Sequence, residues 1–201
     1  MGVLVDDMIS SGMLQNPHII DAFRAVDRKY FVPASFAEHT YIDAPLPIGN
    51  GQTISQPSTV AFMLEHLEPQ EGDKILDIGS GSGWTTALLC QIVGEKGSVT
   101  GVERVDALVG QGEENLAKLH FDCHWHIERA GEKLGLSGEQ FDRILVSASA
   151  DEIPEELFSQ LKVGGILVIP VGNSIYKFKK VSEEEIETEE FYGFVFVPLI
   201  Y

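Results

Sequence analysis

The chain has 201 residues, of which 44% are hydrophobic and 22% charged, a composition typical of one globular domain with a continuous core. Its formal net charge of −17 argues against a nucleic-acid partner, because contacts with phosphates require a basic surface. No basic segment followed by an apolar run opens the sequence, and no stretch approaches the roughly 20 apolar residues of a membrane span. We therefore expect a soluble, cytoplasmic protein, with a monomer as the default state.

Residues 1–36 are expected to be helical, because Ile19, Phe23 and Val26 recur at helical spacing and Asn16 before Pro17 marks a helix start. Residues 41–57 form a loop rich in proline and glycine that is too long for a simple connector, which is typical of functional loops. Helical spacing returns over residues 58–67. We expect residues 1–57 to form an N-terminal helical cap and a substrate and cofactor loop, and residues 58–201 a cofactor-binding core, together making one domain.

Short apolar runs then alternate with helical stretches, which predicts an α/β fold with a doubly wound, mostly parallel, Rossmann-like sheet. The expected strands are residues 74–78, 98–103, 124–128, 141–147 and 166–171. The segments between them are expected to be helical at residues 85–93, 106–119 and 154–161, with a turn near Lys133. Ligands of such sheets bind where the strands end, so functional motifs should follow strands.

The last forty residues differ in pattern from the rest of the core. Residues 176–181 and 191–198 are predicted to form an antiparallel pair that closes one edge of the sheet. The acidic run between them, residues 183–190, is interpreted as a solvated hairpin tip or as an edge guard.

Cysteine and histidine provide little evidence for special chemistry. Two cysteines are too few for a disulfide framework or a zinc cluster; Cys90 lies within an apolar helical pattern and Cys123 at the start of an expected strand. We expect both to be buried thiols. His124 and His126 would share one face of a strand, but no third ligand accompanies them, so no metal site is predicted.

The segment LDIGSGSG, from Leu76 to Gly83, joins an expected strand to a helix that begins near Trp84. Glycines allow close approach of a ligand and a tight turn into a helix N-terminus. A dinucleotide fingerprint requires a third glycine where Trp84 stands, and a phosphate-binding P-loop requires a lysine that is missing here. The remaining interpretation is a loop for S-adenosylmethionine, in which Asp77 organises the methionine end and Glu103, at the end of the next strand, accepts hydrogen bonds from the ribose hydroxyls. The alternative is a tight turn with Glu103 as a surface carboxylate.

The upstream block PLPIGNGQTISQP, residues 45–57, together with LDIGSGSGW, FDRILVSASADEIP and LKVGGILVIPVG, resembles the protein-L-isoaspartate O-methyltransferase family. FRAVDRKYFVP near the start and FVFVPL near the end extend the resemblance over nearly the whole chain, and QTISQP is its most specific block. The resemblance implies methyl transfer from S-adenosylmethionine to the free α-carboxylate of L-isoaspartyl residues in damaged proteins, which is a repair reaction.

The resemblance also implies the roles of individual residues. Ser55 would be the active-site residue. Because a carboxylate is already ionised at neutral pH, Ser55 is expected to align the substrate rather than to act as nucleophile or base; helix capping is its alternative role. The expected cofactor-binding residues are Gln52, Thr53, Ile54, Asp77, Gly79, Ser80, Gly81, Gly83, Glu103, Ala130 and Gly131.

Three departures from the family pattern leave alternatives open. Ala130 stands where the family usually carries an aspartate that binds the adenine amino group, and the loss of one such hydrogen bond costs roughly 1.5 to 3 kcal/mol unless a backbone group or Glu132 replaces it. This change allows a degenerate module with weak or no activity. Ser58 and Asn173 depart near the substrate side and allow a related carboxyl methyltransferase with another substrate. Residues 147–149 either line the methyl-transfer pocket or only permit close packing.

Overall fold

The structure is a computed structural model that describes residues 1–200, and it begins with a helical cap. Two α-helices, α1 (Gly2–Ser10) and α2 (Pro17–Ala25), are followed by the 3-10 helices η1 (Arg28–Tyr30) and η2 (Ala34–His39). The Asn16 side chain caps α2 by accepting a hydrogen bond from the backbone of His18, and Pro17 occupies the first helical turn. The predicted helical character of residues 1–36 and the predicted start of α2 are confirmed.

The expected loop over residues 41–57 contains a small hairpin that sequence patterning did not predict. Strand β1 (Leu46–Gly49) pairs antiparallel with β2 (Gln52–Ile54) through a turn at Asn50 and Gly51, whose φ angles are 54° and 72°. Asn-Gly is the dipeptide that favours such a two-residue turn. Helix α3 (Pro57–Leu67) follows directly, as predicted apart from its first residue.

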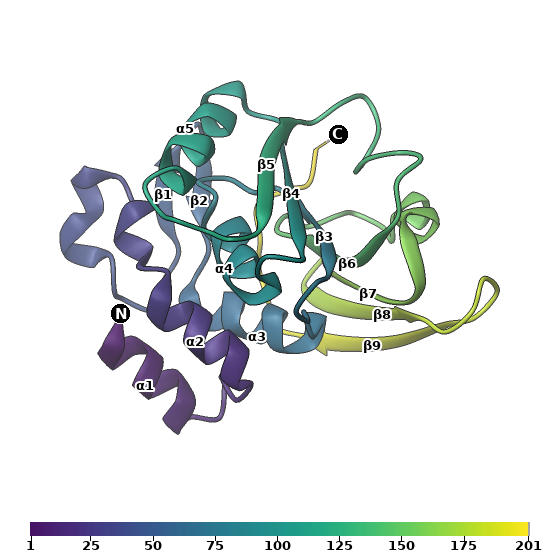
Figure 1. Cartoon of the computed structure of the whole chain (residues 1–201), viewed down its shortest axis with the longest axis horizontal. Helices are drawn as coiled ribbons and strands as arrows, with labels where there is room; N and C mark the ends of the chain where they lie inside the picture. Colours follow the sequence, from purple (N-terminus) through teal and green to yellow (C-terminus); the bar gives the residue numbers. More distant parts are fainter. Residues whose placement is uncertain (201) are drawn as a thin grey trace.

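A seven-stranded sheet forms the core, with the order β5-β4-β3-β6-β7-β8-β9 (Figure 1). Its strands are β3 (Lys74–Ile78), β4 (Ser98–Glu103), β5 (His124–Arg129), β6 (Phe141–Val146), β7 (Leu161–Val171), β8 (Ser174–Lys180) and β9 (Ile186–Tyr192). The strands from β3 to β7 are parallel, whereas β8 and β9 are antiparallel additions at one edge. The predicted fold class is confirmed. The chain moves outward from β3 in one direction and resumes at β6 on the other side, so β3 and β6 flank a switch point where ligands bind.

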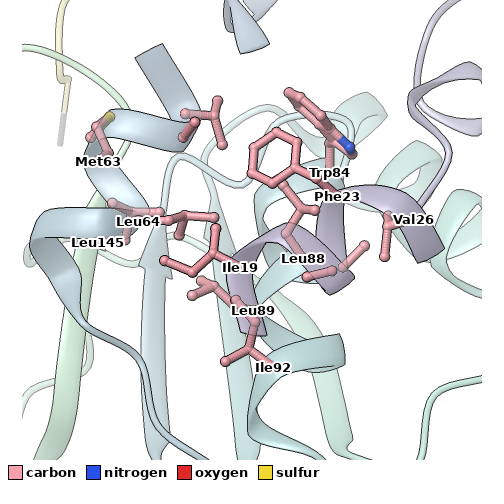
Figure 2. Packing of buried hydrophobic residues seen from close by; sticks show 14 of the residues in the cluster. Ile19, Phe23, Val26, Met63, Leu64, Trp84, Leu88, Leu89, Ile92 and Leu145 are labelled. Carbon is pink, nitrogen blue, oxygen red and sulfur yellow. The ribbon is translucent and has the colours of Figure 1, made fainter. Parts of the chain in front are cut away.

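Helices α3, α4 (Trp84–Val93) and α5 (Asp106–Leu116) cover one face of the sheet, and α2 packs against α3 and α4. Figure 2 shows Phe23 of α2 against Trp84 at the start of α4, with Ile19 and Leu64 close to Leu145 of the sheet. The two rings of Phe23 and Trp84 meet edge to face with centroids 5.7 Å apart. The N-terminal cap therefore packs directly on the helix that begins at the glycine loop.

The opposite face of the sheet is covered by less regular structure. Leu134 and Leu157 are buried against it from the connection after β5 and from η3 (Glu155–Gln160). The segment predicted as a helix over residues 154–161 is thus a 3-10 helix. Only six residues separate Pro154 from the next strand, and helices this short often form i to i+3 hydrogen bonds.

The antiparallel edge was predicted only in part. Strand β8 matches the prediction, but its partner β9 lies in the acidic run, and residues 193–200 leave the sheet. Glu187 and Glu189 stand opposite Lys179 and Lys177 in the ladder, and such opposite charges across a strand pair favour pairing. The acidic run therefore supplies both the hairpin tip and the edge strand.

The prediction of two buried thiols was wrong in one respect. Cys90 and Cys123 are both buried, but they form a disulfide whose Cα atoms are 5.6 Å apart. Helix α4 crosses β4 and β5, and this crossing brings Cys90 next to the residue that precedes β5. Sequence spacing could not reveal this contact. In the described part of the chain, no helix combines the length and the apolar character needed to cross a membrane.

Candidate active site

A cleft lies at the carboxyl ends of β3, β4 and β6. Its wide part holds about 690 Å³ of space that opens to solvent, and a narrower part of about 320 Å³ continues beside Ser55. Both parts share Thr53, Gly79, Gly81 and Ser147, so they form one continuous crevice. One side, called the sheet wall, consists of the residues that follow β3, β4 and β6. The other side, called the loop wall, consists of residues 52–55.

The glycine loop forms the floor of the sheet wall. The φ angles of Gly79, Gly81 and Gly83 are 79°, 55° and 87°, a conformation that other residue types rarely adopt. A side chain at Gly81 would approach Ile48 to 3.3 Å, and one at Gly83 would meet the backbone oxygen of Gly112 at 3.2 Å. Gly79 and Gly81 line the cleft, whereas Gly83 packs against α5 and acts through the turn.

Glu103 holds this loop in place from the end of β4. Its carboxylate accepts hydrogen bonds from the backbone N–H groups of Gly81, at 3.0 Å, and Val105, at 2.9 Å. The side chain lines the wide part of the cleft although it is only 6% exposed. A carboxylate has about four acceptor positions, so this group can still accept hydrogen bonds from a ligand.

Asp77 lies beneath the loop and not on the surface of the cleft. It is fully buried, and one carboxylate oxygen accepts hydrogen bonds from the hydroxyls of Thr85, at 2.7 Å, and Thr86, at 2.6 Å. Burial raises the pKa of Asp77 to about 6, the two threonine hydroxyls oppose this rise, and the charge of Glu103 adds to it. Among residues 1–200, nothing forms a hydrogen bond with its other carboxylate oxygen.

Two further polar atoms beside the glycine loop are buried without a partner in the described chain. They are the hydroxyl of Ser80 and the indole nitrogen of Trp84, and both residues line the narrow part of the cleft. Buried polar groups are normally hydrogen-bonded, so unpaired ones around a cleft indicate a position for a polar ligand or water. The Ser80 and Trp84 atoms and the remaining acceptors of Glu103 fit a ligand that carries charged and hydroxyl groups, and the free oxygen of Asp77 lies behind them under the loop.

The loop wall is formed by β2 and the residue that follows it. Gln52 and Thr53 line the wide part of the cleft, whereas Thr53, Ile54 and Ser55 line the narrow part. The backbone oxygen of Ser55 accepts a hydrogen bond from the buried guanidinium of Arg28 at 2.9 Å. This contact fixes the backbone of Ser55 and leaves its hydroxyl group beside the glycine loop.

Of the two residues expected at the adenine end, Ala130 lines the wide part of the cleft and Gly131 does not. The backbone N–H of Ala130 donates to the backbone oxygen of Glu103, which ties the two strand ends together. The same region is lined by the basic residues Arg104 and Lys133. Glu132, considered as a substitute acceptor for an adenine amino group, is not among the lining residues.

Sequence patterning missed the contribution of the C-terminal segment. Residues 197–200 line the wide part of the cleft, and backbone hydrogen bonds join Ser149 to Val197 and to Leu199. Figure 1 shows the last described residues, in yellow, close to the ends of β4 and β5 and far from the tip of the β8–β9 hairpin. The prediction of a strand over residues 191–198 hid this role. The block FVFVPL was the available clue, but it indicated resemblance and not position.

The residues that follow β6 and the histidines of β5 were the remaining candidates for a role in the site. Ser147 and Ala148 line the cleft, whereas the Ser149 hydroxyl donates to the backbone oxygen of Gly172 at 3.1 Å. His126 contacts Glu128 at 2.8 Å, and within residues 1–200 no group of three potential ligands could hold a metal ion.

The parallel sheet, the G-x-G-x-G loop after β3 in place of the dinucleotide spacing G-x-G-x-x-G, and the acidic Glu103 at the end of β4 are together features of the class of S-adenosylmethionine-dependent methyltransferases. A crystal structure of a Plasmodium falciparum protein assigned as a protein-L-isoaspartate O-methyltransferase, in complex with S-adenosyl-L-homocysteine, superposes with a TM-score of 0.86. It is 27% identical and covers 98% of this chain and 97% of its own.

The sequence profile of the family described as protein-L-isoaspartate(D-aspartate) O-methyltransferase matches residues 2–201, and the chain belongs to this family. A protein-L-isoaspartate O-methyltransferase of Methanococcus maripaludis is 38% identical over 200 residues, covering 98% of this chain and 94% of the relative. One of Methanopyrus kandleri is 39% identical over 202 residues, with coverages of 98% and 89%.

Proposed function

We propose that this chain transfers the methyl group of S-adenosylmethionine to the free α-carboxylate of L-isoaspartyl residues in damaged proteins. The observation that carries the proposal is the position of Ser55. The loop that bears QTISQP forms one wall of the same cleft whose other wall is the glycine loop with Glu103. Cofactor residues and acceptor residues thus face a single space.

On the sheet wall, we assign the cofactor-holding role to the glycine loop, Glu103 and the groups around Asp77. When bound, S-adenosylmethionine supplies a methyl group on a positively charged sulfur. The Ser80 hydroxyl, which lines the narrow part of the cleft, can serve the polar methionine end, Asp77 supports the loop there from beneath, and the carboxylate of Glu103 can accept hydrogen bonds from the ribose. Ala130 offers only its backbone at the adenine end, so adenine is held there with fewer side-chain hydrogen bonds.

On the loop wall, Ser55 and Thr53 are assigned to the acceptor carboxylate. An α-carboxylate has a pKa well below 7 and is ionised at neutral pH, so no residue has to remove a proton. The Ser55 hydroxyl can donate to one carboxylate oxygen and leave the other free to react. Alignment of this kind can supply several kcal/mol of rate acceleration, because the two reactants meet in a fixed geometry. Residues 197–200 contribute a further side of the wide part of the cleft.

The test compares two peptides that differ only at one residue, which is L-isoaspartyl in one and L-aspartyl in the other. With S-adenosylmethionine labelled in its methyl group, we expect alkali-released labelled methanol from the isoaspartyl peptide alone. Equal labelling of both peptides would support a carboxyl methyltransferase of another specificity. No labelling, with no heat of S-adenosylmethionine binding in calorimetry, would support a degenerate module and reject the proposal.

Three further expectations are proposals of the same kind. We propose that residues 1–201 act as one domain, because cap residues such as Phe23 and core residues such as Trp84 share one buried cluster. We propose a monomer without nucleic-acid partners, because a net charge of −17 causes repulsion between copies and from phosphates. We also propose a cytoplasmic location. Light scattering, nucleic-acid titration and cell fractionation test these points.

A further inference from the structure

We propose that Arg28 is a positioning residue for methyl transfer, because its buried guanidinium holds the Ser55 backbone in register with the glycine-loop helix. This inference rests on the proposed function and adds a residue to its machinery. Arg28 touches neither part of the cleft, so it acts through its neighbours and not on the reacting groups.

The hydrogen bonds of Arg28 are unusual for a buried cation. Its side chain is fully buried in η1, and its two terminal nitrogens donate only to backbone oxygens. The acceptors are those of Thr40 at 2.9 Å, Ile42 at 3.2 Å, Ala44 at 3.0 Å and Ser55 at 2.9 Å. A planar guanidinium can bridge several carbonyl groups at once. One side chain therefore ties the segment that precedes β1 to the residue that follows β2.

The environment of Arg28 shows that this arrangement is maintained against a desolvation penalty. Burial lowers the pKa of Arg28 to about 10, and the nearby charge of Asp43 opposes the decrease. A buried charge is tolerated only when it is well hydrogen-bonded or paired. An apolar side chain could fill the same space without this penalty. The presence of a cation here therefore indicates that Arg28 serves to fix the backbone of the loop.

Arg28 also contacts the other wall of the cleft. Its guanidinium carbon lies 5.2 Å from the centre of the Trp84 ring, and Trp84 is the first residue of α4 after the glycine loop. The same cation thus binds the backbone of Ser55 and stacks on the residue next to Gly83. This double contact sets the distance between the residue that aligns the acceptor and the loop that holds the cofactor.

Asp43 completes the clamp on the far side of Ser55. Its carboxylate accepts hydrogen bonds from the backbone N–H of Ser58, at 2.9 Å, and from the Gln56 side chain, at 3.1 Å. It thereby caps the start of α3, a helix that begins two residues after Ser55. Ser55 is held on both sides, and a shift of about 1 Å in such a residue can reduce a rate about 100-fold.

A purely stabilising role must be separated from positioning, and Lys180 provides the matched control. It is a buried cation, 4% exposed, that donates to the backbone oxygens of Phe158 at 3.2 Å and Leu161 at 3.1 Å and also pairs with the exposed carboxylate of Glu183 at 2.7 Å. It contacts the beginning of β7, at the opposite end of the parallel strands from the cleft. None of these residues lines the cleft.

The experiment compares Arg28→Met, Arg28→Lys and Lys180→Met in the full chain, at a temperature at which all remain folded. For Arg28→Met we expect kcat on the isoaspartyl peptide to fall 10- to 100-fold, while the calorimetric Kd for S-adenosylmethionine changes less than threefold. Arg28→Lys should recover part of kcat, because an ammonium group retains some of the donors. Lys180→Met should lower Tm to a similar extent and leave kcat unchanged.

Hydrogen exchange provides a second measurement that does not depend on catalytic activity. Hydrogen exchange of the backbone amides in residues 41–57 should accelerate at least tenfold in Arg28→Met and stay unchanged in Lys180→Met. An unchanged kcat, or unchanged exchange in this segment, in a folded Arg28 variant would overturn the inference. If Arg28→Met does not fold, Arg28→Lys carries both readouts. An inactive wild-type chain would reject the proposed function, and the exchange data would still decide whether Arg28 fixes the loop.

Discussion

The two walls of the cleft are built by different means. The sheet wall takes its geometry from regular strands, since neighbouring strand ends fix Gly79, Glu103 and Ser147 through backbone ladders. The loop wall has only a short hairpin of its own and is held by side chains, chiefly Arg28 and Asp43. A repeating backbone positions groups without help, whereas an irregular loop requires buried polar side chains to satisfy and fix its backbone.

Because the two walls are built differently, we expect one to control cofactor binding and the other to control alignment of the acceptor. Disturbing the sheet wall should weaken cofactor binding or overall stability, because the wall is part of the core. Disturbing the loop wall should reduce turnover, because we propose that the loop presents the acceptor. Each experiment below perturbs one wall and asks whether the effect stays on that side.

The largest expected effect concerns the disulfide that joins the end of α4 to the residue before β5, in the core that carries the sheet wall. Replacing both Cys90 and Cys123 with serine should lower the free energy of unfolding by about 4 kcal/mol, because the bond closes a loop between residues 33 positions apart. Urea unfolding of the double variant and of the wild type, with and without a reductant, measures it. Activity of the folded double variant should be retained. If the reductant leaves the wild-type midpoint unchanged while free thiols become titratable, the disulfide contributes no stability.

An effect of intermediate size is expected from Asp77, which should make the free energy of unfolding depend on pH. Its pKa is raised from 3.8 to about 6 by burial, so between these values the folded chain keeps a proton that the unfolded chain releases. Its contribution to stability is therefore fully present below pH 4 and is lost as the pH rises through 6. Over the whole range about 3 kcal/mol is lost, roughly half of it between pH 5 and pH 8.

Asp77→Asn serves as the reference for this prediction, since an amide does not titrate in that range and can still accept hydrogen bonds from Thr85 and Thr86. The difference in unfolding free energy between the wild type and the variant should shift in favour of the variant as the pH rises from 5 to 8. A difference that stays constant with pH would show that the carboxyl group does not titrate as inferred.

The smallest expected effects come from two substitutions, one in each wall of the cleft, which together test whether binding and alignment are separate. Glu103→Gln should raise the Kd for S-adenosylmethionine about 10- to 100-fold. The NH2 group of the amide would face the N–H of either Gly81 or Val105, which places two donors together, and the charged acceptor for the ligand is lost. Ser55→Ala should lower kcat by a similar factor and change this Kd less than threefold. Calorimetry and initial rates on the isoaspartyl peptide measure both.

Two nearby substitutions control this pair. Glu128→Gln removes a carboxylate on β5 that contacts His126, and Ser58→Ala removes a hydroxyl that accepts a hydrogen bond from Gln56. Both should leave Kd and kcat within about twofold of the wild type. A Ser55→Ala variant that loses kcat and cofactor affinity equally would contradict the separation of the two walls.

Local chemistry made much of the fold predictable. The bounds of β3 and β4 and the capped start of α2 follow from apolar runs, turn residues and Asn16-Pro17, all of which act within a few neighbouring positions. The β1–β2 hairpin was missed although Asn50-Gly51 favours such a turn, because the strands beside it are too short to show alternation. Strand β9 was misplaced because its glutamates are stabilised by lysines on the neighbouring strand, a contact outside the local sequence.

By itself, the sequence determined the class of sheet, the glycine loop with its preference for one kind of cofactor, and the loop that carries Ser55. These features depend on residues close together in the chain. Only the tertiary structure decided that Arg28 binds the Ser55 backbone, that Cys90 meets Cys123 and that residues 197–200 line the cleft. Each of these contacts joins segments that become neighbours only after helices and strands pack, and no local pattern of residues encodes the distance between them.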